Sequence, residues 1–212
     1  MCETMTANDF WEVVKRRRSV RDFLPEPVPR VDIEKILEAA ILAPSGGNKQ
    51  NWHFIVVSSE QTKSQMRQII VDKIQELTKR MKSVKAKKEF SEYSLNYFTF
   101  FSKAPVVIAV VKKPYDSTTQ RILKLYKLEE EYRTTAGLQG VAAAIENMLL
   151  AAETLGYGSC WMTGPTIAHK ELEKFLKIDS ADELVALVPL GKAKTKPPMP
   201  QRKKLAEVVS FL

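Results

Sequence analysis

Residues 140–161 read GVAAAIENMLLAAETLGYGSCW, and this stretch shapes the fold more than any other part of the chain. Its apolar side chains lie on most sides of a helix, so their spacing predicts a long, centrally placed helix over residues 140–155. Gly156 follows where helices commonly end in a left-handed residue, and we expect it to act as the C-cap. Residues 158–161 then predict a strand that starts directly after this helix.

Outward from this helix, further helices and strands follow without a repeat or a linker. Runs of β-branched and aromatic residues predict buried strands over residues 52–57, 105–111 and 184–190. Apolar residues at the helical period predict helices over residues 9–15, 33–41, 62–81 and 171–176. These patterns predict one α+β domain over residues 1–212, a small sheet with helices packed over it.

The composition is that of a folded protein with a basic excess. Of 212 residues, 44% are hydrophobic, and 33 Lys and Arg against 25 Asp and Glu leave a formal charge of +8. Apolar runs are far shorter than the roughly 20 residues of a membrane span, and Glu3, Asn8 and Asp9 stand where a signal peptide would be apolar. Cys2 and Cys160 are too few for a disulfide framework or a zinc site. We expect a cytoplasmic protein with no metal and no membrane partner.

Several common active sites are absent from the sequence. No G-x-G-x-x-G follows a predicted strand, and neither a phosphate-binding G-x-x-x-x-G-K-S/T nor a G-x-S-x-G elbow occurs. His53 lies in a predicted strand and His169 at the start of a helix, where packing or surface roles are more common than catalysis. Cys160 lacks a base or a cation among its sequence neighbours and is expected to be a small buried residue. No side chain is therefore expected to be catalytic.

Three short segments carry cationic or small polar groups. Residues 17–21, RRSVR, offer guanidinium groups and a hydroxyl that suit a phosphate, yet the same residues could form a solvated helix end. Residues 44–48, PSGGN, could bring backbone amides to a ligand or form only a turn. Residues 202–204, RKK, are by themselves typical of surface charge.

Taken in order, four segments resemble the motifs of the nitroreductase family of flavoproteins. Residues 17–23 (RRSVRDF) are similar to R-R-S-x-R-x-F, and residues 43–54 (APSGGNKQNWHF) to A-P-S-x-x-N-x-Q-P-W-x-F, with Asn51 where the family usually has proline. Residues 151–161 resemble the central helix and the strand that reaches the flavin. Residues 188–191 and 202–205 resemble the closing strand and the basic C-terminal motif. The resemblance covers residues 9–209.

This resemblance implies an intertwined homodimer with a small mixed sheet, FMN at the subunit interface, and a variable helical lid or insert over residues 60–103. For the phosphate, it assigns Arg17 and Arg202 as the main contacts, with Arg18 and Ser19 beside them. Arg21 would approach the N1 and O2 edge of the isoalloxazine.

Around the flavin ring, the resemblance assigns residues from three other segments. Thr163 and Gly164 would present backbone to the N5 and O4 side, and Asn96 would meet the pyrimidine edge. The loop that approaches the flavin, from the same or the other subunit, would supply Pro44, Ser45 and Asn48.

The activity that the resemblance implies is an oxidoreductase in which NAD(P)H passes a hydride to flavin N5. A nitroaromatic or quinone acceptor would then enter the same site, giving ping-pong kinetics. A group of aromatic residues at helical spacing could form a lid over the flavin or be core or dimer packing, namely Phe90, Tyr93, Tyr97, Phe98 and Phe101. Reductive dehalogenases and flavin-degrading enzymes resemble the same scaffold and stay open as alternatives.

The distribution of the basic charge bears on the remaining classes. Residues 15–21 hold five cations and residues 192–204 hold six, and neither stretch contains an acid. This fits a phosphate site, whereas a nucleic-acid-binding module needs a basic stripe with aromatic residues. The best such candidate, residues 79–88, is flanked by Glu76 and Glu89. We expect NAD(P)H and a small oxidised acceptor as partners and no nucleic acid, with a non-catalytic flavin-binding protein as a third possibility.

Overall fold

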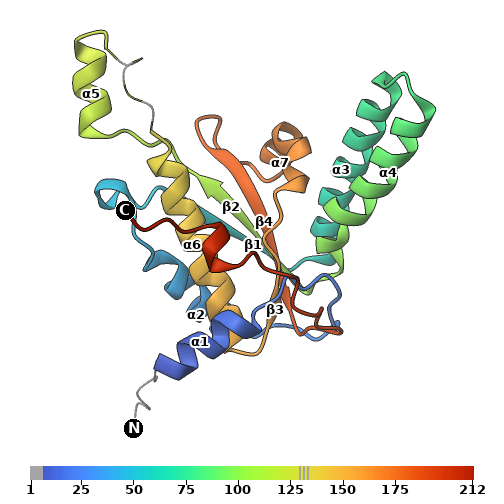
Figure 1. Cartoon of the computed structure of the whole chain (residues 1–212). Helices are drawn as coiled ribbons and strands as arrows, with labels where there is room; N and C mark the ends of the chain where they lie inside the picture. Colours follow the sequence, from blue (N-terminus) through green and yellow to red (C-terminus); the bar gives the residue numbers. More distant parts are fainter. Residues whose placement is uncertain (1–6, 129, 131, 133) are drawn as a thin grey trace.

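A four-stranded sheet in the order β1-β2-β4-β3 forms the centre of the fold (Figure 1). Its strands are Trp52–Val57 (β1), Val106–Lys112 (β2), Glu183–Gly191 (β4) and Gly158–Ser159 (β3). β2 and β4 lie in the middle and are buried almost throughout, as their unbroken apolar runs predict. The computed structural model describes residues 7–128, 130, 132 and 134–212, and in this part of the chain all three strand ladders are antiparallel.

Two details of the sheet differ from the sequence-based expectation. Among the described residues, its parallel component is limited to one isolated bridge, between Ser19 and Ser159. β1 is an edge strand that pairs with β2 alone, so His53 and Val56 are exposed and the expectation of a fully buried strand is wrong. The apolar residues of β1 are typical of a central strand. The position of a strand in the sheet depends on how many strands pair with it, which its own side chains do not indicate.

The long helix predicted in the centre is Ala136–Thr154 (α6), which packs on one face of the sheet together with Arg30–Ile41 (α2). The helix begins four residues before the predicted start. The prediction missed its first turn because Gly137 and Gly140 are weak helix formers and obscure the helical pattern there. Both glycines allow close packing: a Cβ on Gly137 would lie 2.5 Å from the Tyr115 Cβ. At the other end, Gly156 has φ +76°, and Tyr157 N–H donates to Ala152 O at 2.8 Å in a Schellman cap, as predicted.

Two long helices form a hairpin on the other face of the sheet, Glu60–Arg80 (α3) and Val84–Phe98 (α4) (Figure 1). The base of α3 packs on the sheet through Met66, Ile70 and Ile74, and the far end of the hairpin projects away from it. Lys63, which is 1% exposed, donates to the Ala104 carbonyl and to the Glu60 carboxylate, and so fixes the start of α3 to the segment before β2. A short turn, Phe100–Lys103 (η2), joins α4 to β2.

Three further helices and two short turns connect these elements in the described part of the chain. They are Ala7–Arg16 (α1), Gly46–Asn48 (η1), Thr118–Leu125 (α5), Gly164–Ala168 (η4) and His169–Phe175 (α7). α5 is absent from the sequence prediction because it has eight residues and no buried side chain, although its capping box, Ser117 with Gln120, is visible in the sequence. Among the described residues, no helix is long and apolar enough to cross a bilayer.

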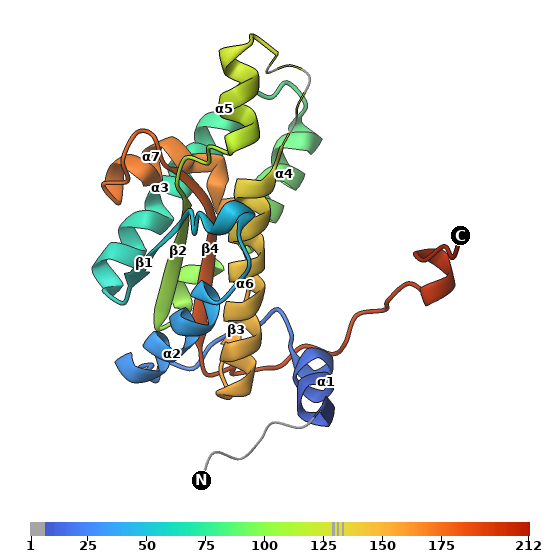
Figure 2. The same ribbon diagram turned by 90° about the vertical axis from the view of Figure 1, so that its left-hand side faces the viewer.

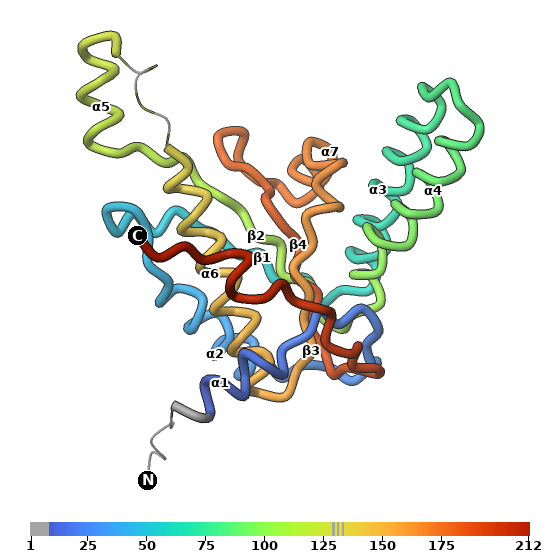
Figure 3. Tube along the Cα trace, in the orientation of Figure 1, coloured from blue at the N-terminus to red at the C-terminus, as the bar shows by residue number. Residues whose placement is uncertain are grey.

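The chain after β4 leaves the body of the protein as an extended arm (Figure 2). Residues 201–212 are exposed throughout and include one short turn, Leu205–Glu207 (η5). Figure 3 shows the N-terminal segment after α1 and the start of this arm meeting at the end of the sheet where β3 lies. Segments about 180 residues apart in sequence are thus neighbours in space.

Candidate functional site

A cavity of about 350 Å³ lies where the segment after α1 meets the start of the C-terminal arm, and we call it the arginine cavity. It is lined by Arg17, Arg18, Ser19 and Arg21 after α1, and by residues 197–200 and Arg202 of the C-terminal arm. The four residues that the resemblance assigns to the phosphate therefore line one cavity, and Arg21, assigned to the flavin ring, lines it with them.

Backbone hydrogen bonds hold both walls of the arginine cavity against the sheet. Val20 N–H donates to Ser159 O at 3.0 Å, which ties the N-terminal wall to β3. Leu24 N–H donates to Lys192 O at 2.9 Å, and Lys194 N–H donates to Asp22 O at 3.0 Å, so the segments that flank the two walls pair with each other. Gly158 is required here, because a Cβ would approach the Val20 side chain to 2.7 Å.

The guanidinium groups of the arginine cavity carry more positive charge than their partners neutralise. Arg17 pairs with Glu146 of α6, Nε to Oε1 3.7 Å. Arg18 donates from Nη1 to the carbonyls of Lys15 and Arg17, and Arg21 donates to Ser19 O at 3.2 Å. Among the described residues, Glu146 is the one carboxylate that pairs with these arginines or with Arg202. The cavity is therefore suited to a ligand with a compact negative charge.

The last turn of α4 lies beside the arginine cavity. The guanidinium carbon of Arg21 is 5.9 Å from the centre of the Tyr97 ring, within range of a cation–π contact. In the same turn, Phe98 packs against η4: a Cβ on Gly164 would lie 2.1 Å from the Phe98 ring, so only glycine fits at that position. Arg21, Gly164 and the turn that carries Asn96 therefore share one region, with Asn96 itself exposed to solvent.

The loop residues Pro44, Ser45 and Asn48 lie elsewhere in the single chain. Ser45 packs against Gly140 near the start of α6, and its hydroxyl accepts a hydrogen bond from Gln50 N–H at 3.0 Å. Asn48 has φ +52°, a left-handed conformation that asparagine tolerates. None of the three residues lines the arginine cavity of its own chain.

Asn51, which stands where the family usually has proline, is buried and joins three segments. Its Nδ2 donates to Lys113 O and to Gly137 O, both at 3.2 Å. The side chain therefore connects the start of β1 with the end of β2 and the first turn of α6. Proline would restrict the backbone at this position, whereas asparagine stabilises it through side-chain hydrogen bonds that proline cannot form.

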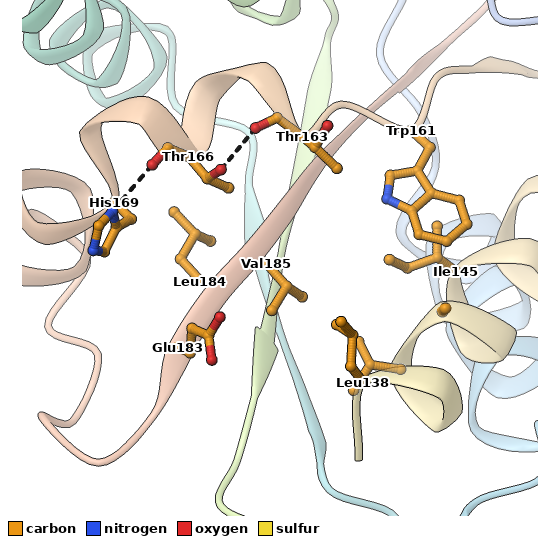
Figure 4. A pocket seen from close by; sticks show the side chains of 11 residues that line it. Leu138, Ile145, Trp161, Thr163, Thr166, His169, Glu183, Leu184 and Val185 are labelled. Carbon is orange, nitrogen blue, oxygen red and sulfur yellow. Dashed lines mark hydrogen bonds between the residues drawn. The ribbon is translucent and has the colours of Figure 1, made fainter. Parts of the chain in front are cut away.

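A second cavity of about 490 Å³ lies between α6, β4 and η4, and we call it the tryptophan cavity (Figure 4). Its walls are mostly apolar, with a few polar side chains, and are formed by Leu138, Val141, Ala142, Ile145, Trp161, Thr163, Thr166, His169, Glu183, Leu184 and Val185. Thr166 donates to Thr163 O at 2.8 Å, and the His169 ring is 3.1 Å from Thr166 O, so two polar side chains fix the backbone of η4. Apart from Thr163, no residue of this cavity had a predicted site role.

The aromatic residues of the predicted lid divide into two groups. Phe101 is fully buried in the core below the hairpin. Tyr93 and Tyr97 are 57% and 47% exposed, and their ring centres are 4.8 Å apart. The helical spacing of the aromatic residues thus has two causes. Phe101 is part of the core, whereas Tyr93 and Tyr97 form an exposed aromatic surface next to Arg21.

Cys160 and possible metal ligands are further chemical groups to consider among the described residues. Burial raises the pKa of the Cys160 thiol, although Arg21, Ser19 and Arg17 oppose this rise. A buried neutral thiol is a poor nucleophile, in agreement with its predicted packing role. Cys2 lies outside the described residues. Within the described part of the chain, no group of three or more His, Cys, Asp and Glu side chains could hold a metal ion.

The sequence profile of the nitroreductase family matches residues 14–192. The chain belongs to the nitroreductase family. One relative is a protein from Archaeoglobus fulgidus named as an NADH dehydrogenase/NAD(P)H nitroreductase. It is 34% identical to this chain over 151 residues, which cover 71% of this chain and 65% of that protein. This family assignment confirms the resemblance seen in the sequence.

Iodotyrosine deiodinases are also relatives within the nitroreductase family. The enzyme of Danio rerio is 28% identical over 184 residues, covering 86% of this chain and 59% of the deiodinase. The chain therefore spans 65% and 59% of the lengths of these two relatives.

Solved structures of nitroreductase-family proteins share this fold. A BluB-like flavoprotein from Clostridium difficile 630 superposes with a TM-score of 0.88 at 33% identity, covering 95% of this chain and 98% of that one. An iodotyrosine deiodinase crystallised with FMN and 3-iodo-L-tyrosine has a TM-score of 0.71 at 25% identity, covering 95% and 100%. The predicted α+β nitroreductase fold is thus confirmed.

Proposed function

We propose that this protein is an FMN-dependent oxidoreductase that moves electrons from NAD(P)H to a small oxidised acceptor such as a nitroaromatic or a quinone. The observation that carries the proposal is the arginine cavity, in which Arg17, Arg18, Arg21 and Arg202 meet around about 350 Å³. A relative of the same fold is crystallised with FMN, whose phosphate is the kind of anion that such a cavity suits.

The donors of the arginine cavity fit a phosphate group in number and in type. Guanidinium groups bind phosphate oxygens through paired N–H donors, and Ser19 adds a hydroxyl. Because Glu146 neutralises only Arg17, the cavity keeps a positive field for the phosphate dianion. We propose Arg17 and Arg202 as the main phosphate ligands, with Arg18 and Ser19 in support.

Arg21 would serve the flavin ring rather than the phosphate. Its contact with Tyr97 turns the guanidinium toward α4 and the region of Gly164. A fixed positive charge beside a ring that accepts an electron pair stabilises the negative charge that develops there. Thr163 and Gly164 would present backbone to the reacting side of the ring, and Asn96 would add a polar contact from α4.

When bound, FMN would take a hydride from NAD(P)H and pass electrons to the acceptor. The protein would position both substrates in turn at one site, which gives ping-pong kinetics. The tryptophan cavity, with its apolar walls and Trp161, supports a flat organic acceptor. In this mechanism no side chain has to act as a general acid or base. We also propose a cytoplasmic location, because a free thiol such as that of Cys160 is typical of proteins in a reducing compartment.

We further propose that the active form is an intertwined homodimer. Pro44, Ser45 and Asn48 are remote from the arginine cavity of their own chain, and a second copy would supply them. The C-terminal arm exposes a series of apolar side chains that includes Leu205, Val208, Phe211 and Leu212. An arm of this kind gains stability by packing against a partner subunit.

Reductive dehalogenation is the second candidate function. It is favoured by the match of an iodotyrosine deiodinase to 86% of this chain. The two candidates share FMN and differ in the acceptor, so they separate in a substrate panel. A nitroaromatic, a quinone and a halogenated tyrosine should be compared as oxidants of the reduced protein.

The absorbance spectrum of the purified protein tests the proposal directly. We expect a yellow protein that releases FMN on denaturation and bleaches when NADH or NADPH is added without oxygen. A colourless protein that gains no flavin absorbance with added FMN would contradict it.

A further inference from the structure

Glu153, in the last turn of α6, connects the two ends of the chain. Its side chain is only 10% exposed, and its Oε1 lies 2.6 Å from Lys196 Nζ and 3.7 Å from Arg16 Nε. Lys196 belongs to the C-terminal arm and Arg16 is the last residue of α1. One carboxylate oxygen thus pairs with a cation from each end of the protein.

This position is unfavourable for a carboxylate on local grounds. The C-terminal end of a helix carries partial negative charge, which repels Glu153, and burial adds a desolvation penalty. The two cations offset both effects. The arrangement is therefore specific, because it brings one carboxylate together with cations from two distant segments.

The two cations stand directly beside the walls of the arginine cavity. Arg16 precedes Arg17, whose guanidinium lines one wall. Lys196 precedes the proline-rich residues 197–200, which line the other wall and lead to Arg202. Because proline restricts the backbone, the position of Lys196 is transmitted along this segment to Arg202.

A second carboxylate of α6 supports the same wall. Glu146 pairs with Arg17 and precedes Glu153 by seven residues, which is two helical turns, so both side chains lie on one face of the helix. Glu153 does not itself line the arginine cavity. Its influence on a ligand there must pass through the segments that it holds.

We propose that Glu153 is a positioning residue that sets the distance between Arg17 and Arg202 and thereby the fit of the arginine cavity to a phosphate group. This inference rests on the proposed FMN function. It makes a prediction opposite in sign to simple electrostatics. Removing a negative charge near a bound phosphate should tighten binding if only the field matters, whereas loss of a positioning contact should weaken it.

The test compares FMN with riboflavin, which lacks the phosphate, on the flavin-free full-length protein. Dissociation constants are measured by quenching of flavin fluorescence for the wild type and for Glu153→Gln. We expect Glu153→Gln to weaken FMN binding by about three- to tenfold, as for loss of a partly buried ion pair, and to leave riboflavin binding unchanged. Lys196 is exposed, so Lys196→Gln should leave the protein folded. This variant should also lose affinity for FMN and keep its affinity for riboflavin.

Glu76→Gln is the matched control, since Glu76 also pairs with two cations, Lys73 at 3.0 Å and Arg80 at 3.9 Å, but on α3. It should bind both flavins as the wild type does. If the wild type binds no FMN, the proposed function fails. If the wild type binds FMN, two results would overturn the role of Glu153. One is tighter or unchanged FMN binding by both Glu153→Gln and Lys196→Gln, and the other is an equal loss of affinity for FMN and riboflavin.

Discussion

The guanidinium of Arg21 lies over the ring of Tyr97, 5.9 Å from its centre, and this contact joins the N-terminal motif to the helical hairpin. Arg21 belongs to a segment held against β3, whereas Tyr97 belongs to α4, whose far end projects from the sheet. The contact therefore sets where the exposed aromatic surface of α4 lies relative to the proposed flavin site.

Replacing Tyr97 with leucine should remove this contact while keeping an apolar side chain. We expect the KM for an aromatic acceptor to rise about two- to fivefold, the size of an exposed cation–π contact. Steady-state kinetics with a nitroaromatic provides the measurement. Tyr97→Phe keeps the ring and should behave as the wild type, so an equal rise in both variants would contradict the role of the ring.

Arg17→Ala should weaken FMN binding strongly. A charge-assisted hydrogen bond contributes about 1.5–3 kcal/mol, which corresponds to a loss of roughly 10- to 100-fold in affinity. Riboflavin, which has no phosphate, should bind the variant and the wild type alike. Equal FMN affinity in both proteins would remove Arg17 from the phosphate site.

Arg21→Ala should act on the reduction potential more than on cofactor retention. Loss of one positive charge near the flavin ring should lower the potential by roughly 20–60 mV. Equilibration with a reference dye under anaerobic conditions measures this shift. Arg18→Ala serves as the control, because it removes a guanidinium whose Nη1 donates to local backbone carbonyls. A shift in Arg18→Ala as large as in Arg21→Ala would show that the effect is not specific to Arg21.

Gly164→Ala should disturb the packing of α4 on η4. Its new methyl group would lie 2.1 Å from the Phe98 ring, and overpacking of this kind costs about 1–3 kcal/mol of stability. Urea denaturation measures the loss. Adding Phe98→Leu should restore part of the stability of Gly164→Ala, and a double variant no more stable than the single one would place the strain elsewhere.

Tyr157 should make the stability of the protein depend on alkaline pH. Burial and the hydrogen bond from its hydroxyl to Asp32, 2.6 Å long, raise the pKa of Tyr157 to about 12. The folded state thus holds the phenol proton more tightly than the unfolded state, whose tyrosine pKa is about 10. The contribution of Tyr157 is full below pH 10 and is lost as the pH rises toward 12. In urea denaturation, the stability difference between the wild type and Tyr157→Phe should shrink over this range, and a constant difference would contradict the link.

Deleting residues 205–212 should separate dimer formation from phosphate binding. This truncation removes the exposed apolar end of the arm and keeps Arg202. We expect light scattering to show a monomer, while Arg202→Ala should remain a dimer and lose FMN affinity instead. A truncated protein that stays dimeric would contradict a structural role for the arm between subunits.

Local motifs made much of the site predictable. The basic segments around Arg17 and Arg202 follow the family motifs, and the structure brings them into one cavity. The tryptophan cavity is different, because Trp161, His169 and Glu183 come from three segments and belong to no shared motif. Only the pairing of β4 with its neighbours and the packing of α6 bring such residues together, and neither is visible in local spacing.

The same limit applies to the fold. The centre of the sheet was predictable because β2 and β4 are apolar over most of their length, and the end of α6 because Gly156 marks it. The exposure of β1 depends on how many strands pair with it, which its own residues do not record. The ion pairs of Glu153 were not predictable from the motif around it, since its two partners are more than 40 residues away on one side and more than 130 on the other.

The assembly of the arginine cavity from opposite ends of the chain has a consequence for biosynthesis. Arg17 leaves the ribosome well before the other wall, because Arg202 and the proline-rich segment emerge only after more than 170 further residues have been made. At roughly 5–20 residues per second, the first wall waits about 10–40 seconds for the second. An anion that needs both walls can be captured only after Arg202 has been made, so loading of the cavity marks a chain whose synthesis has passed Arg202.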